Sequence, residues 1–158
     1  MIKYLNYSVT FQEVPDEISL CFNITNCRFH CRGCHSPELQ KNLGNDLEHD
    51  LLRIIDKYRG GITCICFLGE GHDFYALFRV ISTIRHFEPE LKICIYSGSD
   101  DITEFDDWIH SGLIDYIKIG SYNAKLGGLD SRTTNQHMYA VDGDALKDIT
   151  SKFWRKKV

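Results

Sequence analysis

Three of the seven cysteines, Cys27, Cys31 and Cys34, lie within eight consecutive residues and have the spacing CxxxCxxC. A cluster this tight does not suit the disulfide framework of a secreted protein and favours metal or redox chemistry. Thiolates are the usual ligands of iron–sulfur clusters, normally one for each iron of a [4Fe-4S] cluster. Three thiolates leave one iron without a protein ligand, and an open iron can bind a further molecule. The spacing therefore predicts a catalytic [4Fe-4S] cluster on one short loop.

A zinc site is the alternative interpretation of this loop. Structural zinc normally takes four ligands, and the fourth would come from His30, His35 or Cys21. The remaining cysteines fall inside apolar stretches and are expected to be small buried residues rather than ligands: Cys64, Cys66 and Cys94.

The cysteine cluster begins where an expected strand ends. Residues 18–25 alternate strictly between apolar and polar side chains, which is typical of a strand, and residues 62–68 are a nearly continuous apolar run. Further strands are expected at 91–96 and 114–119, and helices at 47–58, 74–84 and about 101–110. Strands alternating with helices predict an α/β fold with a mainly parallel sheet, in which ligands bind at the carboxyl ends of the strands.

The chain has the length of one domain, so residues 1–158 are expected to pack as a unit. A closed eight-stranded βα barrel usually needs about 250 residues, so 158 residues predict an incomplete (partial) βα barrel. An incomplete barrel has an open side, where a large partner can bind.

Composition argues against some classes of partner. The net charge is -4, with 18 basic and 22 acidic residues mixed along the chain, so no broad cationic surface is expected for nucleic acid. No stretch approaches the roughly 20 apolar residues that span a bilayer, and the first residues lack a basic region followed by an apolar run. A soluble, cytoplasmic protein is expected, with a dispensable tail at 152–158.

The cysteine motif, placed after the first expected strand, resembles the signature of the radical S-adenosylmethionine (SAM) superfamily. In that superfamily the open iron binds the amino and carboxylate groups of SAM, and reductive cleavage releases a 5'-deoxyadenosyl radical. Gly33 before the last cysteine, followed by His35, resembles the CxGCH pattern of the activating proteins of anaerobic ribonucleoside-triphosphate reductase, which are glycyl-radical activases. Residues 114–120 and 133–137 resemble that family's late strand and its Asn-Gln-Arg loop, with His137 in place of the arginine.

The resemblance also implies contacts to SAM outside the cluster. Gly69 and Glu70 end the apolar run at the place of a Gly-Gly-Glu motif, with Leu68 replacing its first glycine. Glu70 is then the expected ligand of the methionyl amino group. Ser97 stands in a Tyr-Ser-Gly sequence that resembles a Tyr-Thr-Gly motif, so its hydroxyl is expected near the ribose or carboxylate of SAM, or else in an ordinary Ser-Gly turn. Gly33 and Gly69 complete the expected SAM-binding set, and no catalytic residue is assigned beyond the cluster.

The implied substrate is a protein. In the family the radical removes hydrogen from a glycine Cα of the anaerobic (class III) ribonucleotide reductase, and the electron comes from a low-potential donor such as flavodoxin or ferredoxin. The stretch 125–137 is expected to dock the reductase through Asp130 or Arg132, or to be a mobile surface loop. Two alternatives remain: a radical SAM enzyme that acts on a small molecule, like a 7-carboxy-7-deazaguanine synthase, and a zinc-binding adaptor without catalysis. The small-molecule enzyme ranks below the reductase activase, because no extra strands are expected from which to build a substrate pocket.

Overall fold

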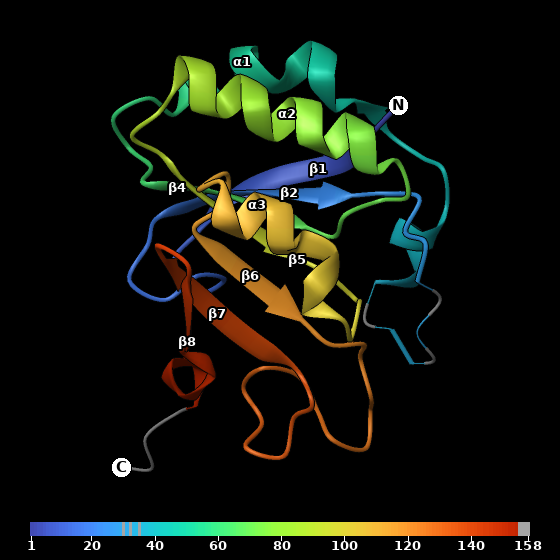
Figure 1. Ribbon diagram of the computed structural model, residues 1–158. Helices are drawn as coiled ribbons and strands as arrows, with labels where there is room; N and C mark the ends of the chain where they lie inside the picture. Colours follow the sequence, from blue (N-terminus) through green and yellow to red (C-terminus); the bar gives the residue numbers. More distant parts are fainter. Residues whose placement is uncertain (30, 32, 35, 155–158) are drawn as a thin grey trace.

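The strands of the computed structural model, which describes residues 1–29, 31, 33, 34 and 36–154, form one eight-stranded sheet (Figure 1). The spatial order is β3-β1-β2-β4-β5-β6-β7-β8, so β3 and β8 are the two outermost strands of the sheet. The strands are β1 (Lys3–Thr10), β2 (Ser19–Ile24), β3 (Asn45–Asp46), β4 (Cys64–Leu68), β5 (Lys92–Tyr96), β6 (Tyr116–Ile119), β7 (His137–Asp142) and β8 (Ala145–Asp148).

The centre of the sheet is parallel and both sides are antiparallel. β2, β4, β5 and β6 pair in parallel, and they correspond to the four strands expected from the sequence. β1 and β3 on one side, and β7 and β8 on the other, pair antiparallel. The sheet is therefore mixed, which corrects the expectation of a mainly parallel one. The outer strands are partly exposed, and β1 and β8 carry no continuous apolar run, so these two sequences lack the signal that marks the central strands.

Helices occupy the connections between the central strands. They are α1 (Leu47–Lys57), α2 (Phe74–Phe87) and α3 (Asp106–His110), with short 3-10 helices η1 (Pro37–Gln40), η2 (Ile102–Phe105) and η3 (Thr150–Phe153). The Asp46 carboxylate caps α1 by accepting from the Glu48 N–H, and the Asp73 carboxylate caps α2 by accepting from the Ala76 N–H. The helix expected at 101–110 is divided, with η2 leading into α3.

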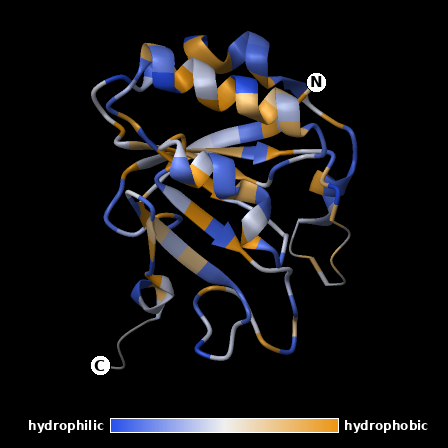
Figure 2. Cartoon of the chain, in the orientation of Figure 1, coloured by the Kyte–Doolittle hydropathy of each residue, from blue (hydrophilic) through white to orange (hydrophobic). Residues whose placement is uncertain are grey.

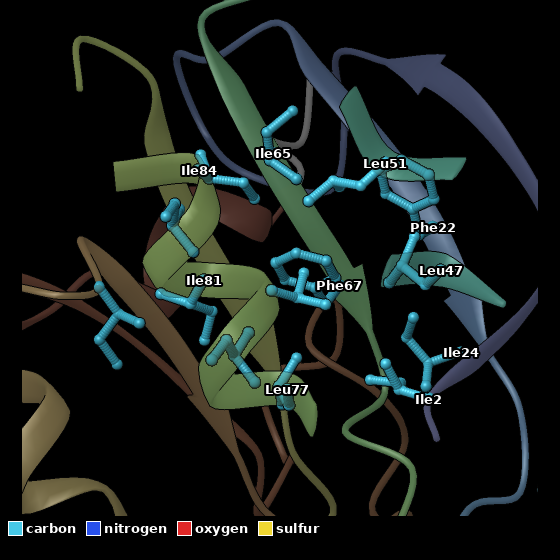
Figure 3. Close-up of a cluster of buried hydrophobic side chains, with 14 of the residues drawn as sticks. Ile2, Phe22, Ile24, Leu47, Leu51, Ile65, Phe67, Leu77, Ile81 and Ile84 are labelled. Carbon is cyan, nitrogen blue, oxygen red and sulfur yellow. The ribbon is translucent and has the colours of Figure 1, made fainter. Parts of the chain in front are cut away.

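The main core lies between the helices and one face of the sheet. Phe22 and Phe67 point from neighbouring strands toward α1 and α2, where Leu51 and Leu77 pack against them (Figure 3). All four side chains are almost fully buried. Each helix carries hydrophobic and hydrophilic bands, as an amphipathic helix on a sheet must (Figure 2).

The opposite face of the sheet carries a smaller core that is rich in sulfur. Cys21, Cys66 and Cys94 stand in register on three adjacent strands, and Cys64 lies two residues before Cys66 on the same face. The loop between β1 and β2 and the helix η3 cover this face through Val14 and through Ile149 and Phe153. The expectation that Cys64, Cys66 and Cys94 are buried is confirmed.

The C-terminal segment is part of this packing as far as Trp154. Phe153 lies against the smaller core, and the Arg132 guanidinium carbon lies 5.1 Å from the centroid of the Trp154 ring. Residues 153 and 154 therefore pack against the rest of the chain, while residues 155–158 of the tail expected to be dispensable lie outside the described part of the chain. Among the residues described, no helix is both long enough and apolar enough to cross a membrane.

Candidate active site

The carboxyl ends of the four parallel strands meet at one edge of the sheet. The cysteine loop, residues 25–36, follows β2; Gly69 and Glu70 follow β4; Ser97 follows β5; and Gly120 follows β6. This edge is where parallel sheets bind ligands, so the fold brings the sequence-predicted residues to one region. The loop of residues 121–136 joins them there, because a Cβ atom on Gly33 would lie 3.6 Å from the Cβ of Ala124.

The cysteine loop is held by main-chain hydrogen bonds. The Cys27 N–H donates to the Leu39 carbonyl at 3.1 Å, and the Cys34 N–H donates to the Cys31 carbonyl at 3.2 Å. Gly33, just before Cys34, has φ of 74°, in the left-handed region that favours glycine. The sequence assigned Gly33 to SAM binding, and this backbone conformation is a further reason for glycine at that position. His30, Arg32 and His35 lie outside the described residues, including two of the predicted zinc ligands.

The thiols of Cys27, Cys31 and Cys34 are free and only partly buried. Burial raises the pKa of the Cys27 thiol, and the neighbouring charges of Cys31, Glu70 and Cys34 raise it further. In the described part of the chain, no three His, Cys, Asp or Glu side chains are gathered closely enough to hold a metal ion. The three thiols share one loop, and as a set of soft donors they fit an iron–sulfur cluster.

Glu70 lies beside the cysteine loop with its side chain only 2% exposed. One oxygen, Oε1, accepts from Nε of Arg28 at 2.5 Å, while Oε2 is buried and has no hydrogen-bond partner among the described residues. A buried carboxylate oxygen without a partner is costly, so Oε2 offers a place for a donor group from a ligand. An ammonium group fits it, which agrees with the predicted role of Glu70.

Lys118 on β6 is a site residue that the sequence interpretation missed. Its buried ammonium donates to the carbonyls of Ser97 at 3.0 Å and Gly120 at 2.9 Å. Burial lowers the pKa of Lys118 to about 8, against the opposing effects of Cys31 and other anionic groups nearby. A lysine in the expected strand 114–119 was the available signal, because a buried charge in a strand needs a specific reason.

Ser97 is fully buried, and its hydroxyl is engaged in a local turn. Its Oγ accepts from the Ser99 N–H at 2.9 Å, which is the Ser-Gly turn that the sequence left as an alternative. Gly69 has φ of 111°, a conformation that favours glycine, and it leads the chain from β4 directly to Glu70. Neither Ser97 nor Gly69 is among the residues that line the two cavities described next.

Two cavities open beside the cysteine loop, and they share no lining residue. The larger, of about 750 Å³, is lined by Cys34, Lys118 and Gln136 together with residues of the β1–β2 loop and of η3. The smaller, of about 350 Å³, is lined by Arg28, Glu70, Gly71, His72, Phe74 and Glu104. The structure therefore brings Cys34 and Lys118 together in one cavity, and Glu70 and Arg28 together in the other.

The comparisons with known proteins give no further assignment. No protein-family model, no curated protein and no solved structure matches the chain. Function has to be inferred from the residues of the site.

Proposed function

We propose that the chain is a radical SAM enzyme of the partial-barrel type, with Cys27, Cys31 and Cys34 holding a [4Fe-4S] cluster. The observation that carries the proposal is the CxxxCxxC loop at the carboxyl edge of parallel strands, beside the buried Glu70 with one free oxygen. When bound, the cluster would supply the electron that cleaves SAM to a 5'-deoxyadenosyl radical. Free thiols must stay reduced for such a cluster to assemble, so we expect a cytoplasmic enzyme.

The chain's own residues would bind and orient SAM. Oε2 of Glu70 would accept a hydrogen bond from the methionyl ammonium, because it is the buried acceptor that lacks a donor. Lys118 uses two of its three donors on the carbonyls of Ser97 and Gly120, which leaves the third for an anionic group in the larger cavity, whereas Glu70 lines the smaller one. Lys118 also adds a positive charge near the cluster ligands, whose thiolates are negative.

For the substrate, we propose the anaerobic (class III) ribonucleotide reductase, with a glycyl radical as product and a low-potential flavodoxin or ferredoxin as electron donor. The support is the resemblance of the Gly33 motif and the late segments, together with the position of the 125–137 stretch. Four of its residues, Gly128, Leu129, Asp130 and Gln136, line the larger cavity, where an incoming protein segment would lie.

A second candidate substrate is a small molecule, as for a 7-carboxy-7-deazaguanine synthase. The sequence offered no extra strands for a pocket, but the structure adds β7 and β8 and a cavity of about 750 Å³. That volume lies within the roughly 300–1,000 Å³ of small-molecule sites. The zinc adaptor is a weaker candidate, because Cys21 is buried in register with Cys66, away from the cysteine loop.

Anaerobic reconstitution tests the chemistry. We expect about four irons and four sulfides per chain, and release of 5'-deoxyadenosine from SAM after reduction by dithionite. Cys31→Ala should abolish both, whereas Cys94→Ala, which removes a buried thiol of the smaller core, should retain both. A colourless, zinc-loaded protein that leaves SAM intact would overturn the proposal and favour the adaptor.

Co-expression with an anaerobic ribonucleotide reductase tests the substrate. The expected result is the doublet of a glycyl radical in electron paramagnetic resonance (EPR), lost in Cys31→Ala. SAM cleavage without the doublet would remove the reductase as substrate and favour the small-molecule candidate.

A further inference from the structure

Arg28 lies between two cysteines of the motif, at a position where the spacing itself requires no particular residue. Its side chain makes two ion pairs, with Oε1 of Glu70 at 2.5 Å and with Oε2 of Glu104 at 2.6 Å. The two glutamates come from different connections, one after β4 and the other in η2. One guanidinium therefore joins the cysteine loop to two other segments of the site.

Further contacts hold Arg28 in this position. Its N–H donates to the Gly71 carbonyl at 3.3 Å, and its guanidinium carbon lies 4.4 Å from the centroid of the Phe29 ring. Arginine is suited to this role because its planar fork can bind two carboxylates at once.

The environments of the two glutamates differ. The Glu70 side chain is 2% exposed, whereas that of Glu104 is 38% exposed. Burial of a carboxylate is costly unless a positive group pairs with it, and Arg28 is the partner that the structure shows. Water can solvate the Glu104 carboxylate, so Glu104 does not depend on Arg28 in the same way. Its contribution is to hold the Arg28 guanidinium where Glu70 can reach it.

We infer that Arg28 is a positioning residue that holds the Glu70 carboxylate turned so that Oε2 stays free for a cationic group of the ligand. This inference deepens the proposed function and rests on it, the cationic group then being the ammonium of SAM. Glu104 supports Arg28 from the exposed side of the smaller cavity, which all three residues line.

The test measures SAM binding and turnover separately in Arg28→Gln, Arg28→Lys, Glu70→Gln and the double variant Arg28→Gln/Glu70→Gln. Binding is followed by the change that SAM causes in the EPR spectrum of the reduced cluster, and turnover by 5'-deoxyadenosine. We expect Arg28→Gln to raise the KM for SAM about tenfold or more, with a much smaller change in kcat. Arg28→Lys should retain part of the affinity for SAM, because lysine keeps the positive charge but lacks the planar guanidinium that can bind two carboxylates.

The double variant separates positioning from general damage to the loop. If Arg28 acts through Glu70, the double variant should bind SAM no more weakly than Glu70→Gln alone. Additive losses, or a loss of iron in Arg28→Gln, would overturn the inference in favour of a structural role. Arg53→Gln is the matched control, since Arg53 pairs with Asp50 on α1, away from the site.

The proposed function and the inference fail in different ways. Wild-type protein that binds no cluster or leaves SAM intact would overturn both. Wild-type protein that cleaves SAM, with Arg28→Gln showing the same KM, would overturn only the role of Arg28.

Discussion

The ring of Phe29 lies directly on Gly98, so that a Cβ atom at position 98 would be 2.8 Å from Cδ2 of the ring. The contact joins the cysteine loop to the turn that follows β5. It also explains the second residue of the Ser97-Gly98 pair, because only glycine leaves room for the aromatic ring. Gly98 therefore positions the cysteine loop as well as forming a turn.

Gly98→Ala should displace Phe29 and, with it, the cysteines on either side. We expect a loss of about 1–3 kcal/mol in the free energy of unfolding, as for an overpacked contact, and a lower iron content after reconstitution. Chemical denaturation and iron analysis measure the two effects. Gly61→Ala is the control, because a Cβ there meets nothing closer than 3.4 Å; equal iron content in both variants would contradict the positioning role of Gly98.

Because of Lys118, the free energy of unfolding of the cluster-free protein should rise with pH in the alkaline range. Because burial lowers its folded pKa to about 8, below the unfolded value, the unfolded chain holds the proton more tightly between these two values. Stability should therefore rise as pH increases above 8, by about 2 kcal/mol at pH 10. The charged or titratable groups that act on Lys118 include Cys31, Asp100, Cys27 and Glu70.

The measurement compares unfolding of wild type and Lys118→Met from pH 7 to pH 10. The difference between the two curves should show the rise, since the other titrating groups are common to both proteins. A constant difference across this range would show that Lys118 keeps an ordinary pKa in the folded protein.

The seven cysteines should divide into two classes in the cluster-free, folded protein. The thiols of the cysteine loop are partly exposed, while Cys21, Cys64, Cys66 and Cys94 are buried. Burial also raises the pKa of the Cys66 and Cys94 thiols, which keeps them in the unreactive protonated form. A thiol-reactive disulfide reagent should therefore modify Cys27, Cys31 and Cys34 rapidly, and the other four only on unfolding. Rapid reaction of a thiol of the smaller core, located by mass spectrometry, would contradict this division.

Substitutions of Asp130 and Arg132 should have different effects, although both residues lie in the stretch 125–137 proposed to dock the reductase. Asp130 lines the larger cavity, whereas Arg132 stacks on Trp154 and so has a structural partner. Asp130→Ala should weaken binding of the reductase by about tenfold while SAM cleavage is retained. Arg132→Ala should in addition loosen the C-terminal segment, seen as faster proteolysis near Trp154. Unchanged capture of the reductase by Asp130→Ala would remove the docking role of this stretch.

Local patterns predicted a large part of the sheet and its helices. The alternation in residues 18–25 and the apolar run 62–68 gave strands at β2 and β4, because each central strand is recognisable from its own side chains. β1, β7 and β8 were missed, because a partly exposed antiparallel strand takes its stability from the strand beside it rather than from its own pattern.

The sequence by itself determined that three thiols stand at CxxxCxxC spacing at the end of a strand, since spacing along a loop is a local property. Tertiary structure decided which charges face that loop. Arg28 pairs with Glu70, 42 residues away, and with Glu104, 76 residues away. Lys118 reaches the site from β6 for the same reason: parallel strands bring their carboxyl ends to one edge, and no local pattern records which side chains meet there.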